Sequence, residues 1–138
     1  MKRNTFRYLE SITYEYYDIL KQIKEIEQEI LHATDNSHDD VQPGKVTSKN
    51  INSETETRAT ALLTDKRLIR LKQQVEAIDK VYDSLMDEKR ELIKIYYWNR
   101  PAGKNLTGLA HDLNLTPRTA YRWRREFIIK LGKELGEI

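Results

Sequence analysis

The stretch NLTGLAHDLNLTPRTAYRWRREFIIKL, residues 105–131, carries the strongest structural signal in the 138-residue chain. It predicts a short helix over residues 107–113 and then a tight turn at Asn114, one of the few residues other than glycine that tolerates a left-handed backbone. Thr116 is expected to cap a second helix, and Pro117 suits its first position because the missing amide costs nothing there. The expected buried side chains are Leu106, Leu109, Ala110 and Leu113 in the first helix, and Ala120, Trp123, Phe127 and Leu131 in the second.

The spacing of these elements predicts a helix-turn-helix, in which two crossed helices approach closely through small buried residues. The exposed face of the second helix would carry Thr116, Arg118, Thr119, Tyr121, Arg122 and Arg125, with Arg124 toward one edge. Arginine pairs with guanine or binds phosphate, and Thr and Tyr reach phosphates or the thymine methyl group. We therefore predict that residues 116–131 read double-stranded DNA. The alternative is a basic amphipathic helix that only packs against its neighbours.

The charge is uneven along the chain, although 24 Lys and Arg against 22 Asp and Glu give a net charge of only +2. Residues 1–34 sum to −1, residues 35–56 to −3, residues 57–86 to +2 and residues 87–138 to +4. Within the last segment, Pro117 to Arg125 holds four Arg and no acidic residue. This asymmetry indicates a contact with nucleic acid or another polyanion.

Two long segments before this motif carry a heptad pattern. A helix is expected from Thr5 to about Leu31, with Leu9, Ile12, Tyr16, Ile19, Ile23, Ile26 and Ile30 along one seam. Residues 32–53 lose the periodicity and contain a Pro43-Gly44 turn signal, which predicts a loop. Ser53 and Glu56 then form a capping box before a second long helix that should reach about Met86. Its apolar stripe comprises Ala61, Leu68, Leu71, Val75, Ile78, Tyr82 and Leu85.

The expected fold is all-α, with heptad-patterned helices and a C-terminal helix-turn-helix domain. The predicted segments are a heptad helix at 1–34, a flexible linker at 35–56, a second long helix at 57–86 and a DNA-binding domain at 87–138. This domain would open with a helix from Asp87 to Asn99 that ends before Pro101. The two heptad helices can fold back as a hairpin, form a coiled coil with a second molecule, or do both.

Composition excludes several other classes of function. With no Cys, the chain has no disulfide, thiolate zinc site or cysteine nucleophile. His32, His38 and His111 lack ligand spacing, and Asp35, Asp39 and Asp40 lack the Gly and bidentate Glu of a calcium loop, so no metal or other cofactor is expected. No catalytic set can be assembled, so we expect no enzyme. No stretch is apolar enough to span a membrane, which predicts a soluble cytoplasmic protein.

The aromatic residues offer two interpretations. Tyr96, Tyr97, Trp98 and Trp123 could stack on bases, as in proteins that bind single strands. Their helical spacing beside Leu92, Ile93 and Phe127 favours the core of the C-terminal domain instead.

Three parts of the chain resemble the C-terminal region of the RinA-like and ArpU-like phage transcriptional regulators. They are the segment from Leu92 through Tyr96-Tyr97, the LAHDLNLTPRTAYRWRRE core and the closing LGKELGE. These are similar in turn to the helix-turn-helix of sigma-factor region four. The likeness is clearest over residues 85–138. Asn114 departs from the Gly often found in such turns.

The resemblance implies a temperate phage or prophage origin and the activation of late genes in the host bacterial cytoplasm. It places DNA contacts at Thr116, Arg118, Thr119, Arg122 and Arg125. It also implies RNA polymerase as a partner, and the heptad helices predict a homodimer. Two alternatives stay open: a small terminase-like packaging subunit that recognises DNA as a ring, and a purely structural coiled-coil protein.

Overall fold

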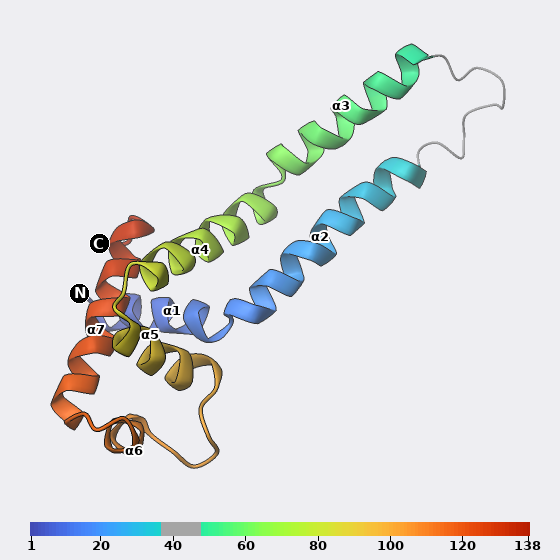
Figure 1. Ribbon diagram of the computed structural model, residues 1–138. Helices are drawn as coiled ribbons and strands as arrows, with labels where there is room; N and C mark the ends of the chain where they lie inside the picture. Colours follow the sequence, from blue (N-terminus) through green and yellow to red (C-terminus); the bar gives the residue numbers. More distant parts are fainter. Residues whose placement is uncertain (37–47) are drawn as a thin grey trace. The chain divides into compact units, whose positions relative to one another are not determined.

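The computed structural model describes the backbone of residues 1–36 and 48–138 and the side chains of residues 1–33 and 55–138 (Figure 1). Over the described backbone the chain is helical and contains no strand, which confirms the all-α class. The expected Pro43-Gly44 turn lies outside these residues. No helix in the described part is both long and apolar enough to cross a membrane.

The chain divides into two compact units. Unit 1 comprises Met1–Tyr17 and Gln74–Ile138, and unit 2 comprises Asp18–Gln73. Residues 87–138, expected as a domain of their own, therefore share unit 1 with the start of the chain and with residues 74–86.

The helix expected from Thr5 to Leu31 is interrupted at Glu15, which separates α1 (Arg3–Tyr14) from α2 (Tyr16–Asn36). The Trp98 indole donates a hydrogen bond to the Thr13 carbonyl oxygen, at 2.8 Å. In a continuous helix that oxygen would accept from the amide four residues later. At the break, the Trp98 indole therefore donates to a carbonyl oxygen that a main-chain amide would otherwise bind. The heptad pattern did not predict this contact.

The second heptad segment also differs from the expectation. α3 (Ser48–Thr64) begins five residues before the predicted cap at Ser53, and residues 48–52 contain no Gly or Pro that would interrupt it. The helix then breaks at Asp65, and α4 (Lys66–Asp83) ends three residues before Met86. Asp65 Oδ1 accepts from the main-chain amides of Arg67 at 2.9 Å and Leu68 at 3.1 Å, which is the action of an N-cap.

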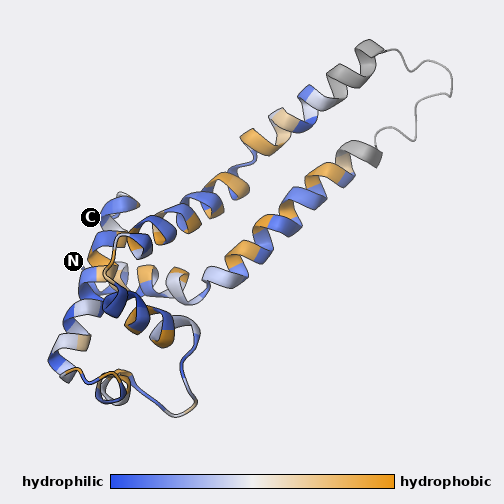
Figure 2. Ribbon diagram, in the orientation of Figure 1, coloured by the Kyte–Doolittle hydropathy of each residue, from blue (hydrophilic) through white to orange (hydrophobic). Residues whose placement is uncertain are grey.

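Within unit 2, the two arms of the chain run antiparallel. Glu27 pairs with Lys72 at 3.2 Å and Glu29 with Arg67 at 3.7 Å, so residue numbers rise along one arm as they fall along the other. Figure 2 shows apolar bands that recur between hydrophilic ones along α2 and α4. Among the apolar residues of the expected seams, Ile19, Ile23, Leu68 and Leu71 are buried in this unit.

Unit 1 is built around the last four helical elements of the chain. These are α5 (Asp87–Ile93), the π-helix η1 (Lys94–Trp98), α6 (Leu106–Asp112) and α7 (Pro117–Glu134). The helix expected over Asp87–Asn99 is thus confirmed in position, but its last turn is a π-helix. Its predicted buried side, Leu92, Ile93, Tyr96 and Tyr97, is indeed buried.

The N-terminal helix α1 packs against α7 inside unit 1. Gly132 of α7 permits the close approach, because a Cβ atom there would lie only 3.0 Å from the Leu9 side chain. Leu9 itself is fully buried. The segment expected as one end of a heptad arm is therefore part of the core beside α7.

Candidate nucleic-acid interface

The turn between α6 and α7 has the backbone geometry that the sequence predicts. Asn114 is the one non-glycine residue with positive φ among those described, at 58°. The Leu115 amide donates to the Ala110 carbonyl at 2.8 Å and the Asn114 amide to the His111 carbonyl at 3.1 Å. These bonds satisfy the carbonyls left open at the end of α6 and turn the chain directly into α7.

The start of α7 is fixed by Thr116 and Pro117. The Thr116 hydroxyl oxygen accepts from the Thr119 amide at 3.2 Å, and Pro117 occupies the first helical position. The Thr116 hydroxyl in turn donates to the Thr119 hydroxyl oxygen at 2.8 Å. The predicted cap is therefore confirmed. Because the Thr119 oxygen accepts this bond, its own proton is left to donate to a ligand.

Buried residues hold α6 and α7 together at a short distance. Ala110 and Ala120 are both fully buried, and their small side chains allow close packing of the two helices. The predicted core residues Leu106, Leu109, Phe127 and Leu131 are buried as well. Leu113 and Trp123 are only half-buried, so these two side chains are more exposed than predicted.

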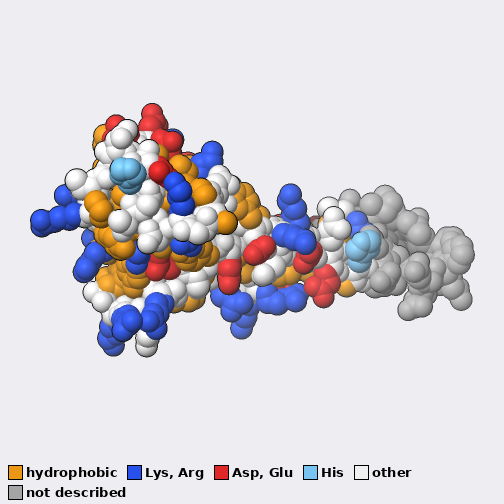
Figure 3. All heavy atoms as spheres, turned by 90° about the horizontal axis from the view of Figure 1, so that it is seen from below, with side chains coloured by type: hydrophobic (Ala, Val, Ile, Leu, Met, Phe, Trp, Pro, Cys, Tyr) orange, Lys and Arg blue, Asp and Glu red, His pale blue; other side chains and the backbone are white. Residues whose placement is uncertain are grey.

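The first half of α7 presents a basic, solvent-exposed face. Arg118, Tyr121, Arg122 and Arg125 are exposed, as is Thr116, whereas Thr119 is half-buried. Figure 3 shows Lys and Arg side chains projecting from unit 1 in that view. The structure therefore brings the predicted site residues together at one end of a single helix, with three guanidinium groups free to reach outward.

Arg122 lies on the α5 side of this face. Its nearest carboxylate is Glu126, at 3.9 Å, and Glu126 also pairs with Lys89 of α5 at 3.3 Å. The Arg122 side chain is 61% exposed. An exposed pair at this distance stabilises little, so the guanidinium can leave Glu126 for a phosphate or a base at small cost.

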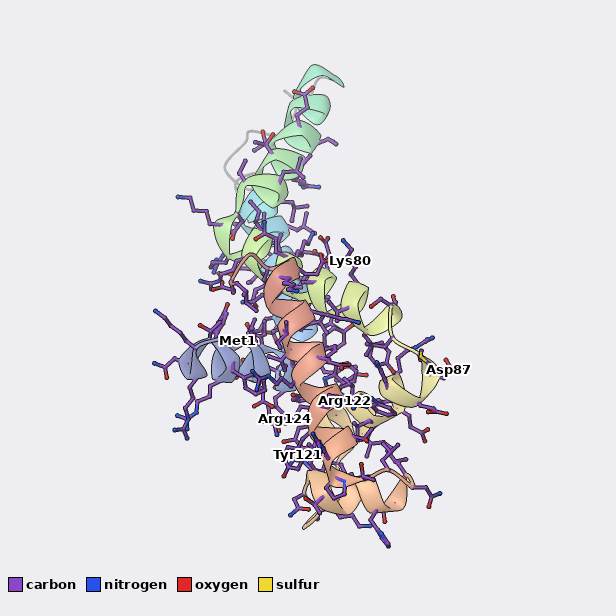
Figure 4. All side chains as sticks on the ribbon, turned by 90° about the vertical axis from the view of Figure 1, so that its left-hand side faces the viewer. Met1, Lys80, Asp87, Tyr121, Arg122 and Arg124 are labelled. Atoms are coloured by element: carbon purple, nitrogen blue, oxygen red, sulfur yellow. The ribbon has the colours of Figure 1, made fainter. Side chains whose placement is uncertain are left out.

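Tyr121 and Arg124 lie on the other side of α7, toward α1 (Figure 4). The Arg124 Nε atom lies 3.3 Å from Glu10 Oε2 of α1, and its guanidinium stands 5.2 Å from the Phe6 ring centre. The same Glu10 oxygen accepts a 2.8 Å hydrogen bond from the Tyr97 hydroxyl. Arg124 therefore joins two helices, in contrast to the exposed arginines beside it.

Burial raises the pKa of the Tyr97 phenol well above its usual range, and the neighbouring Glu10 carboxylate adds to the effect. The phenol is therefore a neutral hydrogen-bond donor at physiological pH. Glu10 thus receives one neutral and one charged donor, which holds α1 in a defined place against η1 and α7.

α1 contributes basic side chains beside this face, which the sequence pattern did not predict. Arg3 and Arg7 line a hollow in unit 1 together with Tyr121, Arg124 and Arg125 of α7. A signal was present, because the first nine residues hold three basic residues and no acidic one. The sum over residues 1–34 concealed it. Among the described residues, no group of three His, Asp or Glu is arranged to hold a metal ion.

Comparison with known proteins gives two matches that cover almost the whole chain. Residues 3–133 match the family described as "Protein of unknown function (DUF722)". The transcriptional activator rinA of Staphylococcus phage phi11 is 31% identical over 137 residues, which cover 99% of this chain and 94% of the relative. No solved structure matches the chain. The chain therefore belongs to the RinA-like family of phage regulators.

Proposed function

We propose that this chain is a sequence-specific double-stranded DNA-binding protein that activates the transcription of phage late genes. In this proposal α6, the Asn114 turn and α7 act as a helix-turn-helix, and α7 enters the major groove. The observation that carries the proposal is the basic face at the start of α7, with Arg118, Arg122 and Arg125 exposed on a helix held by α6. The similarity to an activator favours this role over a packaging subunit.

The expected division of labour follows from the contacts of each side chain. Arg118, Arg122 and Arg125 are exposed guanidinium groups that can pair with guanine or phosphate. Thr119 can donate its hydroxyl proton to a phosphate, while Thr116 acts first as the helix cap. Tyr121, 48% exposed, lies at the α1 side of the face, where it can reach the DNA backbone or a thymine methyl group.

Binding of the purified chain to DNA upstream of the late genes of its phage tests the proposal. Arg118→Ala and Arg122→Ala should each lose about 1–3 kcal/mol of binding free energy where the arginine reads a base. A residue that contacts only phosphate should instead lower the slope of log K against log salt by about one. Footprinting of the wild type locates the site, and an electrophoretic shift at several salt concentrations gives the slopes.

Lys130→Ala is the matched control, because Lys130 is an exposed basic residue of α7 beyond the proposed reading face. It should bind nearly as the wild type does. If both arginine variants bind the footprinted site at full strength with an unchanged salt slope, α7 is not the reading helix.

We also propose that the chain acts as a homodimer in the bacterial cytoplasm and contacts RNA polymerase. The heptad-patterned arms of unit 2 would pair between two copies as a coiled coil, presenting two reading helices to two half-sites. A polymerase contact is suggested by the similarity between the helix-turn-helix of such regulators and that of sigma-factor region four. A closed ring of many copies would instead favour a packaging role.

A further inference from the structure

A basic hollow opens between α1 and α7 in unit 1. Arg3, Phe6 and Arg7 line it from α1, and Tyr121, Arg124 and Arg125 line it from α7; its volume is about 560 Å³. Arg3 and Arg7 are one helical turn apart and therefore share a face of α1. Two helices that are more than 100 residues apart in the sequence thus direct guanidinium groups into one space.

The hollow carries an uncompensated positive charge. Glu10 is its one acidic residue, and this carboxylate is already paired with Arg124 at 3.3 Å and bonded to the Tyr97 hydroxyl. Arg3, Arg7 and Arg125 are exposed, and within the described part of the chain no carboxylate pairs with them. The first turn of α1 contains no acidic residue either.

The basic hollow is continuous with the proposed reading face. Arg125 belongs to both surfaces, since it lines the hollow and stands on the exposed side of α7 with Arg118 and Arg122. Figure 4 shows Arg124 and Tyr121 on the α1 side of α7 and Arg122 on the opposite side. A duplex seated against α7 would therefore bring its backbone past Arg125 toward α1.

We propose that Arg3 and Arg7 bind phosphates of the same duplex whose major groove receives α7. The proposal rests on the proposed function and adds a second helix to the interface. Guanidinium groups match the phosphate geometry with two parallel hydrogen bonds, and half or more of protein–DNA hydrogen bonds go to the backbone. Because α1 stands outside the reading helix, its contacts strengthen binding without choosing the sequence.

Arg124 is the positioning residue of this arrangement. Its guanidinium pairs with Glu10 and stands 5.2 Å from the Phe6 ring and 5.7 Å from the Tyr121 ring. It therefore holds α1, and with it Arg3 and Arg7, beside the start of α7. Among the four arginines of the Pro117–Arg125 stretch, Arg124 thus serves the interface through protein contacts rather than through DNA.

The test is the double variant Arg3→Gln/Arg7→Gln, measured against the footprinted duplex and a random duplex of the same length. Two lost phosphate contacts should lower the salt slope by about two and weaken binding at 0.1 M salt by about 10- to 100-fold. Both duplexes should be affected equally, so that the preference for the footprinted site is unchanged. Arg3→Lys/Arg7→Lys should keep most of the salt slope, because lysine also neutralises phosphate.

Lys130→Gln/Lys133→Gln is the control, since it removes the same charge from exposed residues farther along α7. It should leave the slope nearly unchanged. The inference is overturned if Arg3→Gln/Arg7→Gln, folded by circular dichroism, binds with the wild-type slope while Arg118→Ala and Arg122→Ala lose affinity. If those α7 variants also bind normally, the proposed function itself fails. Normal DNA binding with lost transcription would assign the hollow to a protein partner and would also overturn the inference.

Discussion

Arg124 shows how one side chain can depart from the role that its neighbours suggest. The sequence groups it with Arg118, Arg122 and Arg125 in a run without acidic residues. In the structure its side chain is only 23% exposed and is held by Glu10 and by the ring of Phe6. The difference arises because the Glu10 carboxylate, 114 positions earlier in the chain, is brought beside it by the packing of α1.

The Tyr97 hydroxyl is the second donor to Glu10, and its loss should be measurable. Tyr97 is 6% exposed and donates to Glu10 Oε2 at 2.8 Å. Tyr97→Phe should lower the free energy of unfolding by about 1–2 kcal/mol, because a hydrogen bond to a charged group is lost. In this variant the Glu10 carboxylate keeps Arg124 as its partner but loses the Tyr97 donor. Urea denaturation followed by circular dichroism gives the change.

Tyr8→Phe provides a matched comparison for this substitution. The Tyr8 hydroxyl accepts from the Gln74 side-chain amide at 3.1 Å, and this bond joins two neutral groups, which contributes less than a bond to a charged carboxylate. This variant should change the stability by much less than Tyr97→Phe. Equal effects of the two variants would contradict a special role for the buried bond to Glu10.

The helix breaks at Glu15 and Asp65 are features of whole elements that periodicity conceals. The first heptad seam continues across the break at Glu15, because an apolar spacing of three and four residues is insensitive to one irregular turn. In the second segment this spacing begins only at Leu68, just after Asp65. The capping role of Asp65 can be recognised in the sequence only once the break is known. The carboxylate accepts from two amides of the first turn of α4 and pairs with Arg67 at 3.2 Å.

Asp65 should make the start of α4 sensitive to acid. The side-chain hydrogen bond from Arg67, and then the amide of Leu68, hold the pKa of this carboxyl below its usual value. A lowered pKa in the folded state means that the stabilisation is complete above about pH 4 and is lost as the pH falls further. Asp65→Ala should therefore lower the melting temperature at pH 7, and the gap to wild type should close at low pH.

Thermal melts by circular dichroism between pH 7 and pH 2.5 measure this gap. Asp83→Ala is the control, because Asp83 is the last residue of α4 and a carboxylate at a helix C-terminus is unfavourable. This control should not lower the melting temperature at pH 7. A gap between Asp65→Ala and wild type that stays constant with pH would exclude the proposed cap charge as its cause.

For the molecule as a whole, the apolar surface of unit 2 bears on the proposed dimer. Leu63 of α3 is 75% exposed, and Leu31 and Ile69 are 38% and 39% exposed. Apolar groups left in water on heptad-patterned arms favour pairing with a second copy. Leu63→Glu should shift the particle from twice the 16.4 kDa chain mass toward the single-chain mass. Sedimentation equilibrium over a range of concentrations measures the shift.

Met86→Glu is the control for the dimer, because Met86 is 68% exposed but belongs to unit 1. It should leave the oligomeric state unchanged. A wild-type chain that sediments at 16.4 kDa at every concentration would contradict the dimer. The DNA-binding proposal would then apply to one chain bound at a single site.

Local chemistry accounts for those parts of the fold that were correctly predicted. The helical class, the left-handed Asn114, the Thr116 cap and most of the buried faces of α6 and α7 each depend on residues within a few positions of one another. Such short-range constraints leave a pattern in the sequence. The exposed basic face of α7 follows from the same periodicity, since the buried side of a helix fixes its solvent side.

The placement of α1 could not be predicted, because its causes lie far apart in the chain. Leu9 against Gly132, Glu10 with Arg124 and Tyr97, and Trp98 on the Thr13 carbonyl join residues more than 80 positions apart. Contacts of this kind have no period and no fixed spacing, so tertiary packing alone revealed that α1 joins α7 and that Arg3 and Arg7 stand beside Arg125.

The amino-acid order determined which helices form and which faces they bury. The long-range contacts determined which basic groups share one surface, because only packing brings distant charges together.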